Sequence, residues 1–182
     1  KNASSEQKAK YLPKLISGEW IGCMGMSEPD FGSDAIGIQT RAKKEGEFYT
    51  INGTKMWITN AQYSDIAYVY TRTGEGKKDL STFILEKEKG HFEFGKPIHK
   101  MGMRASPTGE LIFDNSKVES NQLVGNEGDS VSHMMKNLDI ERITIAGISL
   151  GIAQACVDEC VKYASERKQF GKEIGKFQLI QK

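Results

Sequence analysis

The chain has 182 residues and a formal net charge of +1, from 25 Lys and Arg against 24 Asp and Glu. This length is enough to bury a hydrophobic core and fits one large domain or two small ones. The balanced charge argues against a nucleic-acid groove or an anionic membrane surface, so neither is expected as a partner.

The cysteine count argues against a disulfide framework, because Cys23, Cys156 and Cys160 are few and odd in number. Cys156 and Cys160 lie four apart in an expected helix without further zinc-finger spacing, so we expect packed thiols, a reducing compartment and no metal site. No run approaches the roughly 20 apolar residues that span a bilayer. The first residues show no signal-peptide pattern, and because both Lys1 and Lys182 are expected to be cuts in a longer protein, any targeting peptide is expected upstream of Lys1.

The first segment, residues 1–16, predicts the end of a helix. Tyr11, Leu12 and Leu15 recur at helical spacing, and Ser17-Gly18 ends the pattern.

From Trp20 to about Val118 the sequence predicts short strands separated by turn residues. Phe48–Ile51 followed by Asn52-Gly53 predicts a β-hairpin. The absence of helix-length patterns argues against a parallel βαβ sheet and favours a compact antiparallel barrel or sandwich. The other β-branched and aromatic segments are Ile66–Tyr70, Thr82–Leu85 and Glu110–Phe113.

From about Gly128 to about Arg167 the pattern predicts a long helix that is apolar nearly all round after residue 143. Such a helix is expected inside a bundle. Because one helix cannot bury itself, we expect its partners to be missing from this chain or supplied by another subunit.

A polar, turn-rich loop runs from Gly25 to Asp34. Backbone donors and hydroxyl groups on such a loop can bind a phosphate or the edge of a polar ring, although a simple connection has the same composition. Neither a GxxxxGK[ST] phosphate loop nor a GxGxxG dinucleotide motif occurs in the chain.

A predicted strand carries Trp57 and Thr59 two residues apart, so both side chains are expected on one face of a sheet. A Trp on a strand can fill the core. The same pair can instead present a flat ring and a hydroxyl to a planar cofactor.

Two further segments carry charged groups on or beside the expected long helix. Asp139 and Arg142 are three apart and can pair weakly. Glu141 can be a solvated helix residue, or a base made stronger by apolar surroundings. Arg167–Gly171 reads as a basic helix end with a glycine stop.

Four segments in this order resemble the acyl-CoA dehydrogenase family: Met26–Gly37, Trp57–Thr59, Asp139–Arg142 and Arg167–Gly171. The resemblance covers the whole chain and implies an α+β fold, with an antiparallel β-barrel middle domain flanked by parts of two helical domains. The implied divisions are residues 1–19, 20–125 and 126–182. Lys100–Ser106 also matches the family and is expected to be structural.

The resemblance implies that the chain binds FAD. Thr59 is then expected to reach the reactive flavin nitrogen. Arg167 is expected to contact the diphosphate of a neighbouring subunit's FAD, because the planar set of donors on Arg suits a diphosphate. Gln178 is expected to lie near the adenine of the same FAD. Phe31 replaces a small residue of the family, so its ring either narrows the site or turns outward. The implied cofactor-binding residues are Met24, Gly25, Met26, Ser27, Glu28, Gly32, Ser33, Trp57, Ile58, Thr59, Arg167, Phe170 and Gln178.

The run Leu138–Arg142 resembles the corresponding helix of isovaleryl-CoA dehydrogenase, and this implies that Glu141 is the catalytic base. The implied reaction is α,β-dehydrogenation of a short branched acyl-CoA, isovaleryl-CoA to 3-methylcrotonyl-CoA in leucine catabolism. Electrons are then expected to pass to electron-transfer flavoprotein. The implied substrate contacts are Ser33, Asp139, Ile140, Glu141 and Arg142.

The resemblance further implies a homotetramer, in the mitochondrial matrix of a eukaryote or the cytoplasm of a bacterium. Two alternatives stay open on the sequence. One is a straight-chain or other acyl-CoA dehydrogenase with its base beyond residue 182. The other is a non-catalytic β-sandwich binding module.

Overall fold

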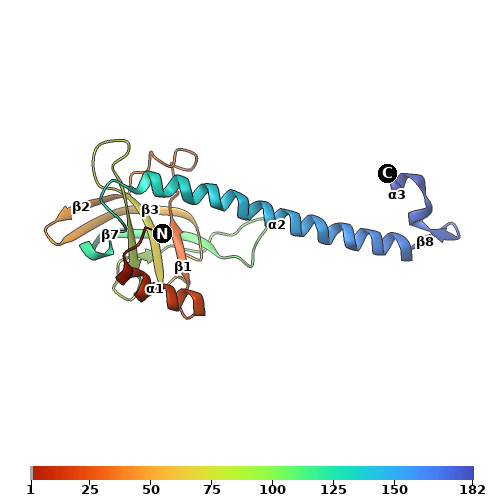
Figure 1. The fold of residues 1–182 in the computed structure, drawn as a ribbon, viewed down its shortest axis with the longest axis horizontal. Helices are drawn as coiled ribbons and strands as arrows, with labels where there is room; N and C mark the ends of the chain where they lie inside the picture. Colours follow the sequence, from red (N-terminus) through yellow and green to blue (C-terminus); the bar gives the residue numbers. More distant parts are fainter. Residues whose placement is uncertain (1) are drawn as a thin grey trace. The chain divides into compact units, whose positions relative to one another are not determined.

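The computed structural model describes residues 2–182, so only Lys1 of the expected first segment lies outside the described part. The chain divides into two compact units, residues 1–134 and 135–182, with the boundary inside the long helix. The three-part division expected from the sequence stays a prediction. Figure 1 draws the chain as a ribbon coloured from the N-terminus in red to the C-terminus in blue.

The elements of the first unit are α1 (Ser5–Ser17), β1 (Gly22–Gly25), β2 (Arg41–Glu45), β3 (Phe48–Thr59), β4 (Ile66–Arg72), β5 (Leu80–Glu86), β6 (Glu93–Phe94), β7 (Thr108–Glu119) and the 3-10 helix η1 (Ser120–Gln122). Helix α2 (Ser130–Glu166) crosses the boundary between the units. The second unit adds β8 (Lys168–Gln169), β9 (Lys172–Glu173), the 3-10 helix η2 (Ile174–Lys176) and α3 (Gln178–Gln181).

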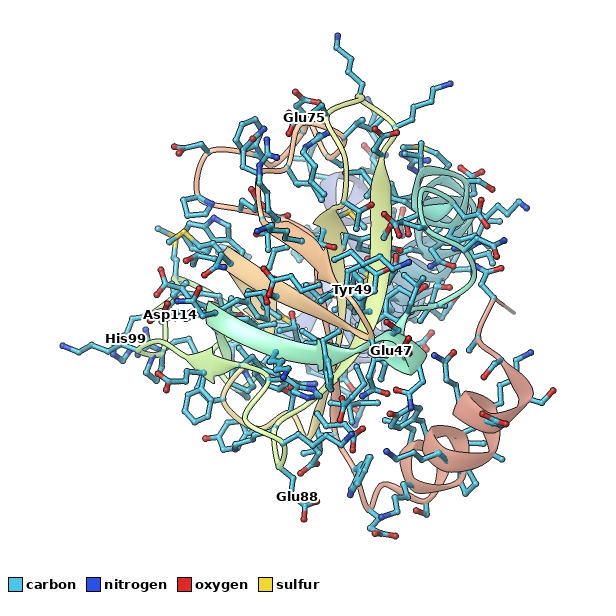
Figure 2. All side chains as sticks on the ribbon, turned by 90° about the vertical axis from the view of Figure 1, so that its left-hand side faces the viewer. Glu47, Tyr49, Glu75, Glu88, His99 and Asp114 are labelled. Atoms are coloured by element: carbon cyan, nitrogen blue, oxygen red, sulfur yellow. The ribbon has the colours of Figure 1, made fainter. Side chains whose placement is uncertain are left out.

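The α+β class is confirmed, and the sheet is mixed rather than purely antiparallel. Seven strands pair in the order β1-β4-β2-β3-β7-β6, with β5 on the other edge of β4. β1 and β2 both run parallel to β4, which the sequence did not indicate. Within residues 2–182 no ladder joins β6 to β1 or β5, so the sheet is open rather than a closed barrel. Figure 2 shows the strands changing direction across the sheet.

The predicted hairpin at Asn52-Gly53 is wrong. The turn lies before β3, at residues 46 and 47, where Glu45 pairs with Phe48 across a two-residue loop and Gly46 adopts a φ of +65°. β3 then continues straight through Asn52-Gly53, where the register against β7 shifts. Gly53 has a φ of +143°, and a Cβ there would lie 2.7 Å from the Thr40 Cα. Glycine is needed at this point for close backbone approach instead of for a turn.

The core of the first unit lies within the curled sheet and joins all the long strands. Tyr49 on β3 and Phe83 on β5 meet edge to face with ring centroids 4.8 Å apart. Figure 2 places Tyr49 among the strands, with Glu75 and Glu88 at opposite ends of the view. The core comprises Ala42, Tyr49, Ile51, Ile58, Ala61, Ala67, Val69, Phe83, Leu85, Phe92, Leu111, Phe113 and Val118.

Helix α1 confirms the expected helix and its end at Ser17-Gly18. It begins with a capping box between Ser4 and Gln7, and it ends where Gly18 takes a φ of +75°. Glu86 of β5 anchors the helix, because one of its oxygens accepts hydrogen bonds from Lys10 and the Tyr11 hydroxyl, each 2.8 Å long.

Helix α2 confirms the expected long helix, and nearly all its side chains beyond Met134 are exposed. The large apolar side chains exposed on it include Ile140, Ile143, Ile148, Leu150 and Val161. By length and composition alone α2 could cross a membrane, which corrects the expectation that no segment approaches that limit. Helices at the centre of water-soluble bundles meet the same criteria, so this finding does not by itself make α2 a membrane span.

Candidate functional site

The N-terminal side of the candidate site is β1 and the loop that leaves it. Met24 is 39% exposed, whereas Gly25 is buried. A Cβ on Gly25 would meet the Lys55 side chain at 3.1 Å, so glycine lets β1 lie close over β3. Met26 and Ser27 follow, both half-buried.

A buried ion pair joins this loop to β3. The Lys55 ammonium lies 2.8 Å from the Glu28 carboxylate, and the two side chains are 0% and 6% exposed. Lys55 also donates to the Met26 carbonyl at 3.0 Å. Burial lowers the pKa of Lys55 to about 8, against the opposing effect of Glu28. Burial alone would raise the pKa of Glu28, but the Lys55 charge and the hydrogen bonds from Lys55, Thr40 and Gln39 together outweigh burial and hold this pKa below its usual value.

A β-bulge in β3 turns the Trp57 side chain to the surface. Lys55 pairs with Leu111 and Ile58 with Gly109, so Met56 and Trp57 together face the single residue between these two on β7. Trp57 takes a φ of +65°, rare for a bulky residue, and its ring is 56% exposed. Backbone strain of this kind gathers at functional sites. The core-filling alternative for Trp57 is therefore wrong.

The bulge brings several groups together at the surface. The Met56 amide donates to the Ser27 carbonyl at 2.9 Å, so Ser27 lies beside the bulge. Thr59 is exposed like Trp57, while Ile58 between them is 3% exposed, which confirms the shared face expected for Trp57 and Thr59. In the described part of the chain, no hydrogen bond engages the Ser27 hydroxyl, the Trp57 indole or the Thr59 hydroxyl. An exposed flat ring, with its own N–H unpaired, thus lies near two hydroxyl groups that also have no hydrogen-bond partner in the described part of the chain.

The loop continues through Gly32 and Ser33, both exposed, to an open cleft of about 620 Å³. Phe31 is half-buried and lines this cleft with Gly37, so its ring narrows the cleft at that end. Figure 2 labels Glu75, which lies on the loop between β4 and β5 and also lines this cleft.

The cleft carries more positive than negative charge. Arg72 is buried, and its guanidinium donates hydrogen bonds to backbone carbonyl oxygens, among them that of Ile36 at 2.7 Å. Arg41 pairs with Glu75 at 2.7 Å. Lys77 and Lys78 also line the cleft, and neither has an ion-pair partner among residues 2–182. These two ammonium groups are available to an anionic ligand.

The second unit holds the candidate base. Glu141 is exposed on α2, next to Ile140, which is 58% exposed. Asp139 and Arg142 form the expected pair at 2.9 Å, but both are more than 70% exposed, so the pair adds little stability. The apolar surroundings expected around Glu141 are absent within the described chain, because a lone helix cannot cover its own side chains.

The C-terminal segment is not the glycine-stopped helix that the sequence suggested. α2 ends at Glu166, and β8 and β9 form a hairpin whose turn residues, Phe170 and Gly171, both have positive φ. The Phe170 ring is 91% exposed and meets Phe177 edge to face, with centroids 6.2 Å apart. Arg167 and Gln178 are exposed at the two ends of this small segment.

The structure therefore gathers Met24–Glu28, Trp57 and Thr59 at one place in the first unit, and Arg167, Phe170 and Gln178 in the second. The binding roles predicted for them stay predictions. Sequence reasoning missed Lys55 and the cleft lysines. A lysine within the predicted strand that carries Trp57 was an available signal for Lys55, whereas two lysines in a polar turn give no such signal for Lys77 and Lys78.

Comparison with known proteins identifies the family. The acyl-CoA dehydrogenase middle domain matches residues 23–116, and the acyl-CoA dehydrogenase C-terminal domain matches residues 128–182. The chain is 45% identical to a mitochondrial 2-methylacyl-CoA dehydrogenase of Solanum tuberosum and 43% identical to a mitochondrial isovaleryl-CoA dehydrogenase of Pongo abelii, each over 100% of this chain and 44% of the relative.

A solved relative agrees in fold. A glutaryl-CoA dehydrogenase from Mycobacterium smegmatis in complex with FADH2 superposes with a TM-score of 0.91 at 36% identity, over 100% of this chain and 46% of that one. The chain spans about half the length of the curated relatives it matches. These matches overturn the alternative of a β-sandwich binding module, and the mixed sheet agrees with them. The chain belongs to the acyl-CoA dehydrogenase family.

Proposed function

We propose that the protein to which this chain belongs catalyses FAD-dependent α,β-dehydrogenation of a short branched acyl-CoA. The proposed substrate is isovaleryl-CoA, an intermediate of leucine catabolism, and the product is 3-methylcrotonyl-CoA. Two electrons and two protons leave the acyl chain, and electron-transfer flavoprotein takes the electrons from the cofactor.

The observation that carries this proposal is the exposed Trp57 ring at a strained bulge, beside unpaired hydroxyl groups on Ser27 and Thr59. A flat aromatic face flanked by hydrogen-bonding groups suits a tricyclic flavin, which has an apolar face and a polar edge. When bound, the flavin supplies the electron-accepting chemistry. Among these groups Thr59 is proposed to hydrogen-bond the reactive edge of the ring, with Ile58 packing beneath it.

In this proposal Glu141 removes the α-proton of the acyl group. A carboxylate within hydrogen-bond reach of that proton is the usual general base for such a step. Asp139, Ile140 and Arg142, on the same turn of α2, are proposed to contact the acyl-CoA. Glu141 is exposed in this chain, so the water exclusion that strengthens a base must come from segments that cover α2 in the whole protein.

The nucleotide end of acyl-CoA carries several phosphate charges, and the cleft beside Ser33 offers matching cations. Lys77 and Lys78 are proposed to attract these phosphates, because both are exposed and unpaired in the described chain. Ser33 belongs to the loop that lines the cleft with Phe31 and Asp34. It is proposed to contact the acyl-CoA between its acyl group and its nucleotide.

The C-terminal hairpin is proposed to serve a neighbouring subunit. Arg167 presents a planar set of donors suited to a diphosphate, and Phe170 is almost fully exposed, as expected of a side chain that packs elsewhere. With Gln178 near the adenine, this arrangement requires a homo-oligomer, proposed to be a tetramer. The proposed location is the mitochondrial matrix in a eukaryote or the cytoplasm in a bacterium.

The test is anaerobic bleaching of the flavin in the full-length, FAD-loaded protein. Isovaleryl-CoA should bleach the yellow absorbance within the time of one turnover, and butyryl-CoA should do so more slowly. Bound flavin that no acyl-CoA bleaches would refute the activity. A Glu141→Gln protein that keeps most of its bleaching rate would refute the assignment of the base.

A second substrate class has specific support. The Solanum tuberosum relative at 45% identity is named a 2-methylacyl-CoA dehydrogenase, so the methyl branch can lie at C2 instead of C3. A straight-chain acyl-CoA, with the base supplied from beyond residue 182, is the remaining alternative. Comparing kcat/KM for isovaleryl-CoA, 2-methylbutyryl-CoA and butyryl-CoA separates the three.

A further inference from the structure

Lys55 and Glu28 form a buried ion pair in the first unit, with side chains 0% and 6% exposed, so neither is exposed enough to act on a ligand directly. The Glu28 carboxylate accepts three hydrogen bonds: from the Lys55 ammonium at 2.8 Å, the Thr40 amide at 2.8 Å and the Gln39 amide at 2.6 Å. Both carboxylate oxygens are therefore engaged inside the protein.

The bonds of this pair fix two stretches of backbone on either side of the site. Through the Met26 carbonyl, Lys55 holds the chain one residue before Ser27. Through the Gln39 and Thr40 amides, Glu28 holds the segment that returns from the loop. Lys55 itself lies two residues before Trp57 on β3, so one ion pair connects the loop to the bulge.

A contribution to stability alone does not explain such a pair. Desolvating two charges costs about as much as their attraction returns, and apolar side chains of similar size often stabilise a protein equally well. An apolar pair, however, cannot direct hydrogen bonds at the Met26 carbonyl and at two backbone amides. What Lys55 and Glu28 add over apolar residues is the position of the backbone that they hold.

We infer that the Lys55–Glu28 ion pair is a positioning device that sets the Met26–Ser27 backbone and the Trp57 bulge at the spacing a flavin ring requires. In this inference the Glu28 carboxylate supports the backbone from inside the protein and does not make the direct cofactor contact that the family resemblance had implied. The inference rests on the proposed function, because it presupposes a flavin at Trp57. Preorganised binding groups lower the free-energy cost of ordering the site when the ligand binds.

The experiment compares four forms of the full-length protein: wild type, Lys55→Met, the double variant Lys55→Met with Glu28→Gln, and Lys43→Met. Lys43→Met is the matched control, because the Lys43 side chain is 80% exposed and, among residues 2–182, forms an ion pair only with Glu45, at 3.3 Å. Three quantities are measured on each: the FAD dissociation constant of the apoprotein, the visible circular dichroism of bound flavin, and the urea midpoint of the apoprotein.

Lys55→Met should weaken FAD binding about tenfold or more, change the flavin circular dichroism and lower the urea midpoint, as small displacements of a supporting group do. The double variant removes the unpaired buried charge and should recover most of the urea midpoint. It should not recover the FAD affinity or the spectrum, because the Met26 carbonyl stays unheld. Lys43→Met should match wild type in all three.

A double variant that recovers FAD affinity and spectrum together with stability would overturn the inference, since the pair would then be only structural. So would a folded Lys55→Met protein with wild-type affinity and spectrum; in both cases the proposed function stands. A wild-type protein that binds no flavin would overturn the proposed function and this inference with it.

Discussion

The two glycines near the start of β3 provide a direct test of how this strand runs. Gly46 is in the hairpin turn at a φ of +65° with open space where a Cβ would be. Gly53 is within the strand at a φ of +143°, and a Cβ there would approach the Thr40 side-chain oxygen to 2.6 Å and its Cα to 2.7 Å. Alanine at the two positions separates backbone strain from steric collision.

The expected costs follow from these geometries. Gly46→Ala adds only the strain of a left-handed alanine, about 1 kcal/mol of unfolding free energy. Gly53→Ala adds strain of about 1–3 kcal/mol in a conformation that favours glycine. It also adds about 1–3 kcal/mol of overpacking against Thr40, whose backbone cannot move aside like a flexible side chain. The expected total is about 4 kcal/mol.

The assay is urea unfolding of the full-length variants, followed by fluorescence and far-UV circular dichroism. Gly53→Ala should lower the unfolding free energy by about 3 kcal/mol more than Gly46→Ala. Had Asn52-Gly53 formed the hairpin turn, Gly53 would be an exposed turn residue and the two substitutions would cost nearly the same. Equal effects would therefore refute the continuous strand through Gly53.

Three further outcomes are expected. Glu141→Gln should lower the rate of flavin bleaching by about 10²–10⁴-fold with FAD affinity unchanged, in stopped-flow and titration measurements; a loss of FAD affinity would contradict its role as base. Lys77→Ala with Lys78→Ala should raise KM for acyl-CoA about two- to fivefold at low salt but leave KM for the acyl-pantetheine ester unchanged, and equal effects on both esters would remove the lysines from the phosphate site. Burial would raise the pKa of Glu86, but hydrogen bonds led by that from Lys10 lower it to about 2, so its stabilisation is complete above about pH 4.5 and is lost as the pH falls toward 2. Glu86→Gln should flatten the acid limb of the stability–pH curve between those values, and an unchanged limb would show that Glu86 is not responsible.

Local signals predicted most of the elements. Helix α1, the long helix α2 and the strands around Phe48–Ile51 and Ile66–Tyr70 follow from periodicity and turn residues that lie within a few positions of each other. The parallel pairing of β1 with β4 could not be predicted in this way, because it joins segments about 40 residues apart and leaves no local pattern. The family resemblance implied the overall fold but not these pairings.

The error at Asn52-Gly53 has a physical explanation of the same kind. The pair is a strong hairpin signal when it stands alone. Here Glu45-Gly46 had already turned the chain, and Asn52 instead bonds across the sheet: its side-chain oxygen accepts from the Asn115 amide at 2.8 Å. Asn115 carries the compensating bulge on β7 with a φ of +51°. Whether the chain turns at Glu45-Gly46 or at Asn52-Gly53 therefore depends on the pairing of β3 with β7, which neither dipeptide reveals.

The bulge at Trp57 explains how one strand serves both the core and the candidate site. In an unbroken strand, Lys55, Trp57 and Thr59 would all point the same way. Lys55 is fully buried, so a regular strand would drive the Trp57 ring into the core beside it. The extra residue in the bulge reverses the alternation: Lys55 points inward to Glu28, Ile58 packs in the core, and Trp57 and Thr59 face outward. The shared face of Trp57 and Thr59 could be predicted from their spacing, but its direction could not, because nothing in the local sequence at Met56-Trp57 signals the bulge. The same bulge places the buried ammonium and the exposed ring two residues apart, which lets the ion pair act on the position of the ring.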